Sequence, residues 1–169
     1  MHDFDMVSPV SKRPKVLVQT AAHVASVARF YRQQDLTDKG QKSYEALKGR
    51  KPGKIFPVCV HPKYGGWFGL RGILLFENVQ IGDQLVRSKP IEIIQSQEKI
   101  AELLYLFNDH WRDKRYRDVG MADNIERYSQ LQQDYFSLAP DKRHQLLLNN
   151  NVLDMKSSAV KVASMSEHV

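Results

Sequence analysis

The chain is poor in cysteine and has no long apolar run. Cys59 is the only cysteine among 169 residues, so no disulfide can form within the chain. This suits a reducing compartment such as the cytosol. The longest apolar run, GILLF, is far shorter than the roughly 20 residues that span a bilayer. No charged and then apolar signal segment opens the chain. We therefore expect a cytoplasmic protein that does not enter a membrane.

Several function classes lack their sequence signatures. There is no P-loop, no GxSxG and no Rossmann glycine pattern, nor any zinc-finger spacing or paired aromatic RNA-binding motif. The formal charge of +6 gives some attraction to anions. The basic cluster at 48–54 is, however, expected to be a solvated loop. In the cluster at 112–118, basic and acidic residues alternate, which weakens it as a phosphate-binding surface. We expect no nucleic-acid partner and, since Asp109, His110 and Asp113 are a weak ligand set, no metal held directly by side chains.

The composition, 42% hydrophobic and 26% charged, predicts one globular domain over residues 1–150. Residues 151–169 have weak periodicity and many small or polar side chains, which predicts a disordered tail. Within the domain, KVLVQTA (15–21) predicts a short buried strand. A helix should follow, capped by Thr20, with one apolar stripe made of Val24, Val27, Ala28 and Tyr31.

The middle of the chain predicts a long loop over 37–54, with one helical turn around 44–47. IFPVCVHP (55–62) and WFGLRGILLF (67–76) predict two strands of an antiparallel hairpin, turned by KYGG. Ser96 should cap a helix, and further helices are predicted at 124–136 and 140–148. The apolar stripe of the Ser96 helix comprises Ile100, Leu103, Leu104, Phe107 and Trp111. The result is an α+β fold with a thin antiparallel sheet and packed helices.

Alternation along the third predicted strand places Trp67, Gly69 and Arg71 on one face, and Phe68, Leu70 and Leu74 on a core face. The first face suits either a flat ligand that closely approaches the backbone or a partly exposed surface.

Other candidate residues leave similar alternatives open. Cys59 either packs as a small apolar group or touches a ligand. His23, expected in the first turn of its helix, is either a structural histidine, kept neutral by the helix dipole, or part of a site. Arginines after the Ser96 helix and at Arg143 either lie on the surface or converge to bind carboxylates.

Four long segments, RPKVLVQTAAHVA, VCVHPKYGGWFGLRG, HWRDKRYRD and ERYSQLQQDYFSLAPDKR, closely resemble the CblC-type (MMACHC) family of cobalamin-processing proteins. The resemblance covers residues 3–148. It implies a flavin-reductase-like or nitroreductase-like α+β domain that binds base-off cobalamin and removes its upper ligand. Glutathione would dealkylate alkylcobalamins, and reduced FMN or FAD, with electrons from NADPH, would expel cyanide from cyanocobalamin.

The resemblance also assigns residues. It implies glutathione-binding roles for Arg71, Arg117 and Arg143, with no residue acting directly as acid or base. The implied cobalamin-binding positions are Asp3, Val16, Leu17, Val18, Gln19, His23, Phe30, Tyr31, Arg32, Cys59 and Leu70. Arg32 stands where glutamine is usual, and Val18 where alanine is usual. The glycines of HPKYGGWFGLRG would leave room for the flat macrocycle.

In the family, the RPK element lies well inside the domain, so the resemblance implies an N-terminally incomplete domain here. The alternative function is a non-catalytic corrinoid carrier or adaptor. The implied partners are a CblD-type adaptor and the methionine synthase machinery, and the implied state is a monomer or a ligand-induced homodimer.

Overall fold

The computed structural model describes residues 7–12, 16–50, 53–74, 76, 78–80, 82 and 91–152. The chain divides into two compact units, Met1–Arg127 and Tyr128–Val169. The predicted position of Asp3 and residues 153–169 of the predicted tail lie outside the described residues. None of the helices in the described ranges has the length and apolar character needed to cross a membrane.

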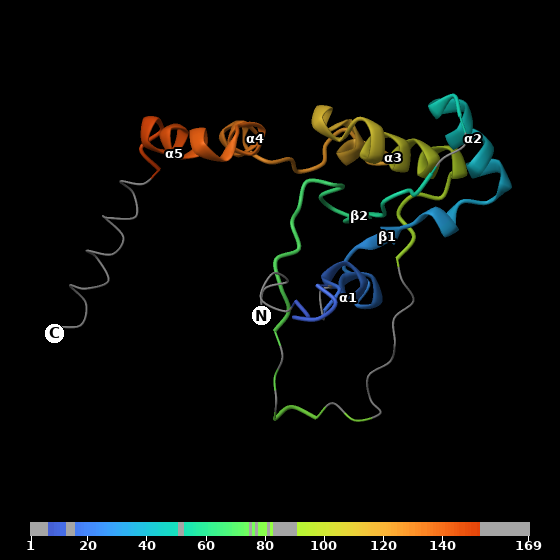
Figure 1. Ribbon diagram of the computed structural model, residues 1–169, viewed down its shortest axis with the longest axis horizontal. Helices are drawn as coiled ribbons and strands as arrows, with labels where there is room; N and C mark the ends of the chain where they lie inside the picture. The colour runs from blue at the N-terminus through green and yellow to red at the C-terminus, as the bar shows by residue number, and fades with distance from the viewer. Residues whose placement is uncertain are drawn as a thin grey trace, which may run out of the picture. The chain divides into compact units, whose positions relative to one another are not determined.

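The first unit is an α+β arrangement, as predicted (Figure 1). Its helices and strands are α1 (Val18–Val24), β1 (Arg29–Tyr31), α2 (Asp38–Lys48), β2 (Val58–Val60) and α3 (Gln97–Asp109). Among the described residues, the 3-10 turn η2 (Gln33–Asp35) lies between β1 and α2, and two more, η4 (Trp111–Asp113) and η5 (Arg115–Asp118), follow α3. The second unit contains α4 (Gln130–Ser137) and α5 (Pro140–Asn149).

Helix α3 forms the centre of the core, and its prediction is confirmed. The Ser96 side chain accepts a hydrogen bond from the Lys99 amide (3.3 Å), which satisfies one of the orphan donors of the first turn. Leu103 and Leu104 are fully buried. Trp111, which the periodicity placed on the same stripe, instead lies in η4 and is 56% exposed.

The two strands pair antiparallel, with Phe30 opposite Cys59 and Tyr31 opposite Val58. The fully buried Tyr31 points into the core, where its hydroxyl accepts a hydrogen bond from the Ile94 amide (2.7 Å). Because side chains alternate along a strand, Phe30 and Cys59 share the other face of the sheet. Both are half-buried.

At the N-terminal end, the strand predicted at 15–21 does not form among the described residues, and the predicted helix is present with different bounds. Helix α1 begins at Val18, after Leu17 and not Thr20, and it ends at Val24. Ser26 then adopts a left-handed conformation (φ 57°), and Arg29–Tyr31 forms β1. The helical spacing of Tyr31 was therefore accidental, because pairing with β2 and burial under α3 take Tyr31 into the sheet.

The loop predicted at 37–54 is mostly helix. Its glycines read as breakers, but Gly40 lies inside α2, where an added Cβ would come 2.5 Å from the Gln97 Oε1 atom and 3.0 Å from Leu36. Gly40 is therefore a packing position between α2 and the start of α3. Gly49 ends the helix in a left-handed conformation (φ 70°), as glycine commonly does.

The hairpin predicted from 55–62 and 67–76 does not form among the described residues. The KYGG turn is present, closed by a bridge between His61 and Gly65, but β2 pairs with β1. Of the side chains expected in the core, Leu74 and Phe76 are 80% and 72% exposed, and Phe68 and Leu70 are only half-buried, whereas Trp67 is buried. After the turn, the Gly66 amide donates to the Arg117 carbonyl (2.8 Å) and the Trp67 indole donates to Asp118 (2.6 Å), so this segment contacts η5.

The second unit bears out the two predicted helices, with a later start for the first. The Ser129 side chain accepts a hydrogen bond from the Gln132 amide (3.3 Å) and caps α4. Pro140 occupies the first turn of α5, where its missing N–H costs no helical hydrogen bond. Arg143 lies on α5.

We expect Leu103→Ala to lower the free energy of unfolding by about 2 to 5 kcal/mol, because it leaves a cavity in the core under α3. Urea titration followed by circular dichroism measures the loss. Leu47→Ala is the matched control, since Leu47 lies on α2 but is 45% exposed. A similar loss in both variants would contradict the position of the core.

Candidate functional site

An open apolar groove of about 720 Å³ lies in the first unit. Its wall is largely aromatic, with contributions from Phe30, Phe56, Phe107, Trp111 and Tyr116. Leu17 and Gln19 of the α1 start, together with Pro57 and Asn108, complete the lining. We call this the aromatic groove. Such an apolar concavity is typical of a site for a flat or partly apolar ligand.

Apolar side chains of the aromatic groove are unusually exposed. Leu17, Phe56 and Trp111 are 56%, 58% and 56% exposed. Phe107 and Tyr116 pack edge to face, with ring centroids 5.1 Å apart, and join the end of α3 to η5. Exposed apolar side chains gathered around one cavity indicate a surface that a ligand or partner covers.

A smaller cavity of about 200 Å³ adjoins the groove and shares part of its wall, including Gln19, Phe107 and Tyr116. It adds Cys59 of β2, Leu70 and Arg117. We call it the arginine cavity. The two adjoining cavities bring together six of the predicted site residues from distant parts of the chain: Leu17, Gln19, Phe30, Cys59, Leu70 and Arg117.

Arg117 is held against the glycine turn that precedes Trp67. The Gly66 amide donates to the Arg117 carbonyl (2.8 Å), and the Arg117 guanidinium donates to the Gly66 carbonyl. The guanidinium carbon also lies 5.2 Å from the centroid of the Trp67 ring and 5.1 Å from that of Tyr116, within cation–π range. Arg117, which lines the arginine cavity, is therefore held in a defined orientation.

The two adjacent glycines have a different role from the one expected. A Cβ at Gly66 would lie 2.8 Å from the Arg117 Cα atom, and one at Gly65 would collide with the Arg117 carbonyl. Gly65 is also left-handed (φ 54°), a conformation that favours glycine. The space expected for a macrocycle at these two positions is thus occupied by the backbone of η5.

The three predicted glutathione-binding arginines have different settings. Arg117 is half-buried, whereas Arg71 is exposed and lines neither cavity. Arg143 belongs to the second unit, where its Nε donates to the Leu138 carbonyl (3.1 Å) and its guanidinium lies 5.3 Å from the Tyr135 ring centroid. Convergence of all three on one ligand stays a prediction.

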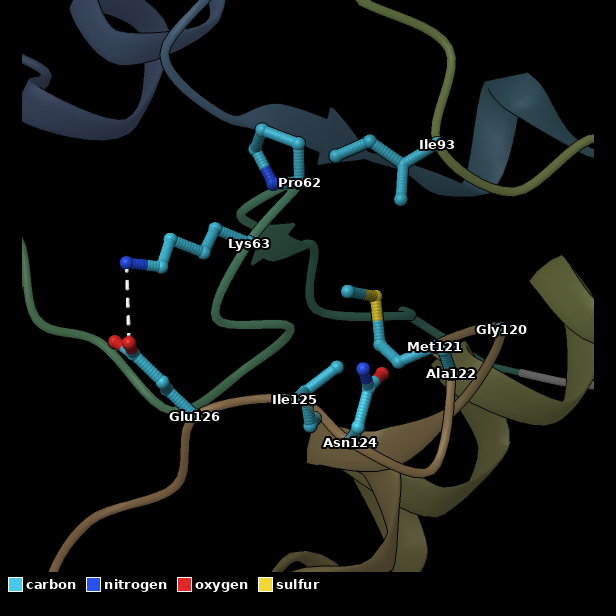
Figure 2. A pocket seen from close by; sticks show the side chains of 9 residues that line it. All are labelled: Pro62, Lys63, Ile93, Gly120, Met121, Ala122, Asn124, Ile125 and Glu126. Carbon is cyan, nitrogen blue, oxygen red and sulfur yellow. Dashed lines mark ion pairs between the residues drawn. The ribbon is translucent and has the colours of Figure 1, made fainter.

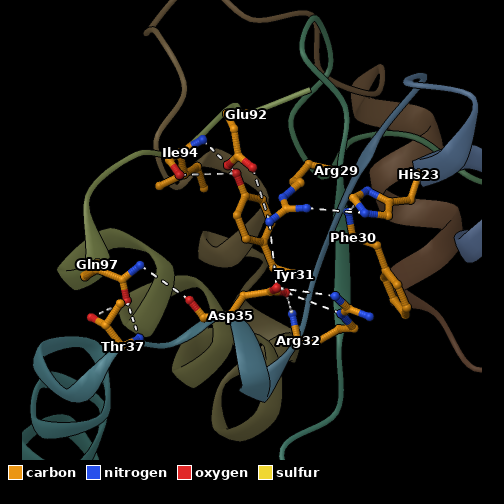
Figure 3. Close-up of polar contacts among 10 residues, drawn as sticks. All are labelled: His23, Arg29, Phe30, Tyr31, Arg32, Asp35, Thr37, Glu92, Ile94 and Gln97. Carbon is orange, nitrogen blue, oxygen red and sulfur yellow. Dashed lines mark hydrogen bonds and ion pairs between the residues drawn. The ribbon is translucent and has the colours of Figure 1, made fainter. Parts of the chain in front are cut away.

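His23 lies in the last turn of α1, and not in the first as predicted (Figure 3). Arg29 approaches its Nε2 atom (3.3 Å), and the Phe30 amide donates toward its Nδ1 atom (3.4 Å). A neutral imidazole has one bare nitrogen, so it accepts a hydrogen bond from only one of these two donors at a time. Burial, and then the charges of Arg29 and Arg32, lower the pKa of His23. The neutral form is thus favoured by the surroundings and not by a helix N-terminus.

The other predicted corrinoid-contacting residues lie near β1. The side chains of Val18 and Tyr31 are buried in the fold, and Val16 is half-buried. Arg32 pairs with Asp35, whose carboxylate also lies 3.7 Å from Arg29 (Figure 3). Corrinoid contact at these positions stays a prediction.

Sequence reasoning missed most of the aromatic groove. Phe107 and Trp111 were assigned to the core stripe of α3, and Phe56 and Tyr116 were not considered. The available signal was the density of aromatic residues just after α3, in HWRDKRY. It was overlooked because helical spacing alone does not distinguish a core stripe from a groove wall.

A separate cavity of about 480 Å³ lies beside the same glycine turn and contains none of the predicted site residues (Figure 2). Met121 and Ile125 contribute apolar side chains, and the Lys63–Glu126 ion pair (3.1 Å) lies at its edge. Across the described ranges, no three His, Cys, Asp or Glu side chains are grouped to hold a metal ion.

Cys59 should be a slow nucleophile, because burial raises the pKa of its thiol to about 12. Only the thiolate reacts with iodoacetamide, so alkylation at about pH 8 should be much slower than for free cysteine, whose pKa is about 8.5. The rate should still be rising above about pH 10. Mass spectrometry of the single cysteine measures it, and a plateau near pH 9 would contradict the buried setting.

Comparison with known proteins identifies a matching family. The family model described as "Methylmalonic aciduria and homocystinuria type C family" matches residues 1–147. A Gallus gallus protein named cyanocobalamin reductase / alkylcobalamin dealkylase is 48% identical over 146 residues, covering 85% of this chain and 56% of the relative. A Homo sapiens protein of the same name is 39% identical over 137 residues, covering 81% and 44%.

A solved structure is also similar, that of the Caenorhabditis elegans B12-trafficking protein CblC, described as a human MMACHC homologue. The TM-score is 0.70 at 32% identity, with 87% of this chain and 53% of that chain covered. The chain thus spans about half the length of the relatives it matches. Because the family match extends over most of its residues, the chain belongs to the methylmalonic aciduria and homocystinuria type C family.

Proposed function

We propose that this chain takes part in cobalamin processing, in which cobalamin is bound and its upper axial ligand removed. The family match over residues 1–147, with relatives named cyanocobalamin reductase / alkylcobalamin dealkylase, carries the proposal. The gathering of six predicted site residues around two adjoining cavities supports it.

The aromatic groove is the proposed seat of the corrinoid. Phe30, Phe56 and Trp111 offer apolar surface for one face of a flat macrocycle, and their exposure would fall on binding. Leu70 and Cys59 of the adjoining arginine cavity would meet the same ligand at its edge. The neutral thiol of Cys59 fits this role as a small apolar contact.

We propose the arginine cavity as the binding site for glutathione. Arg117, with Arg71 and Arg143, would bind the carboxylates of the tripeptide, and the positive charge would favour its thiolate. The sulfur then attacks the carbon bound to cobalt. A carbon–sulfur bond forms, the cobalt–carbon bond breaks, and its electron pair stays on cobalt. The products are cob(I)alamin and a glutathione thioether.

Reductive decyanation of cyanocobalamin is the second proposed reaction, with FMN or FAD carrying electrons from NADPH. We assign no described residue to the flavin, because the corrinoid would take the aromatic groove. We also propose that the fold is related to those of flavin reductases or nitroreductases.

The proposed partners are a CblD-type adaptor and the methionine synthase machinery, in the cytoplasm. Since Phe56 and Trp111 are exposed, a ligand that covers the aromatic groove only in part would leave apolar surface for a second protein. The proposed assembly is a monomer or a ligand-induced homodimer.

Mixing the chain with methylcobalamin and glutathione under anaerobic conditions should produce the absorption spectrum of cob(I)alamin. Omitting glutathione, or heating the protein first, is the control. Corrinoid binding without any glutathione-dependent change would instead favour the carrier or adaptor function. Failure to bind methylcobalamin at all would contradict both.

Arg117→Ala should weaken glutathione use more than cobalamin binding, because Arg117 lines the arginine cavity and not the aromatic groove. We expect KM for glutathione to rise about tenfold, the loss of one charge-assisted hydrogen bond. Arg115→Ala is the matched control, since Arg115 lies on the same turn but lines another cavity and pairs with Asp113 (2.7 Å). An equal loss of glutathione use and corrinoid affinity in Arg117→Ala would count against the assigned role.

A further inference from the structure

Asp118, the last residue of η5, contacts the polar edge of the Trp67 ring. The Trp67 indole Nε1 donates to Asp118 Oδ1 at 2.6 Å, a short charge-assisted hydrogen bond. Trp67 is only 7% exposed, so its indole N–H needs a partner within the fold. The Asp118 carboxylate is that partner. Asp118 ends the matching segment HWRDKRYRD but has no predicted role, and it lies 51 residues away from Trp67 along the chain.

The Trp67 ring, which donates to Asp118, is one of the two aromatic rings that the Arg117 guanidinium contacts; the other is Tyr116. The Arg117 Cζ atom lies 5.2 Å from the Trp67 ring centroid, and the same guanidinium donates to the Gly66 carbonyl. Gly66 and Trp67 are consecutive residues, so one short segment contacts the Arg117 guanidinium twice, through the Gly66 carbonyl and through the Trp67 ring. A shift of the Trp67 ring would therefore change the direction of the Arg117 side chain.

The Asp118 carboxylate is itself fixed. The same Oδ1 atom accepts from Arg127 Nε (3.1 Å), and Arg127 donates to the Asp123 carbonyl (3.2 Å). A second tie, the Lys63–Glu126 ion pair, connects the segment after η5 to the glycine turn (Figure 2). The carboxylate thus has a defined position although its side chain is 41% exposed.

We propose that Asp118 is a positioning residue that acts through Trp67 to aim the Arg117 guanidinium into the arginine cavity. This inference rests on the proposed role of Arg117 in glutathione binding. The guanidinium carries five N–H donors in one rigid plane. It therefore binds a carboxylate with two hydrogen bonds only when that plane is aligned with the carboxylate. Asp118 touches neither cavity in this role, and its effect on glutathione is indirect.

The test compares two variants of the full chain. In Asp118→Ala the indole loses its acceptor, and we expect KM for glutathione to rise about tenfold while the Kd for methylcobalamin changes less than about twofold. In Asp118→Asn the side-chain oxygen still accepts from the indole, so KM should return to within about threefold of the unaltered chain. Rescue by asparagine separates positioning of the ring from loss of charge.

Asp113→Ala is the matched control. Asp113 is an exposed aspartate in the preceding turn η4 that pairs with Arg115 (2.7 Å), and it lines neither the aromatic groove nor the arginine cavity. This variant should leave KM for glutathione unchanged. An unchanged KM in Asp118→Ala, or an equal rise in Asp113→Ala, would overturn the proposal.

A second measurement keeps this inference separate from the proposed function. The order parameter of the Arg117 Nε–H group, from ¹⁵N relaxation and assigned with Arg117→Lys, reports how firmly the guanidinium is held. We expect it to fall in Asp118→Ala and to be retained in Asp118→Asn. If the unaltered chain shows no glutathione-dependent reaction, the proposed function fails, and the order parameter alone decides whether Asp118 positions Arg117. An unchanged value in Asp118→Ala overturns the inference.

Discussion

The close approach of the Gly65–Gly66 turn to the backbone of Arg117 is the constraint on which the site depends. It joins the segment after β2 to η5, which are about fifty residues apart, through the Gly66 amide and carbonyl. Side chains at either glycine would collide with Arg117. Because the backbones touch there, Arg117 and Leu70 reach the arginine cavity beside Cys59.

Two faces of the short sheet have opposite physical characters. On the inner face, Tyr31 is buried under α3 and hydrogen-bonded to the Ile94 amide. On the outer face, Phe30 and Cys59 lie opposite each other and line the adjoining cavities. The same strand pairing that completes the core therefore also forms the floor of the candidate site, which couples stability to ligand binding.

The parts that were predicted correctly depend on local rules. The Ser96 cap and the apolar stripe of α3 identify that helix without any distant contact. The errors occurred where a distant segment decides the outcome. Tyr31 fits a helical stripe but pairs with Val58, and Gly40 looks like a breaker but fits closely against Gln97. Neither contact can be read from a window of neighbouring residues.

The sequence by itself determined the α+β class, the helices whose caps and stripes are local, and the family through four long matching segments. It also supplied most candidate residues through that resemblance. Only the tertiary structure decided that Trp111 and Phe56 line a groove, that Gly65 and Gly66 accommodate Arg117, and that Asp118 holds Trp67. The physical reason is that a groove wall, or a hydrogen bond between two loops, joins segments far apart in the chain, whereas a cap or an apolar stripe lies within a few turns of one helix.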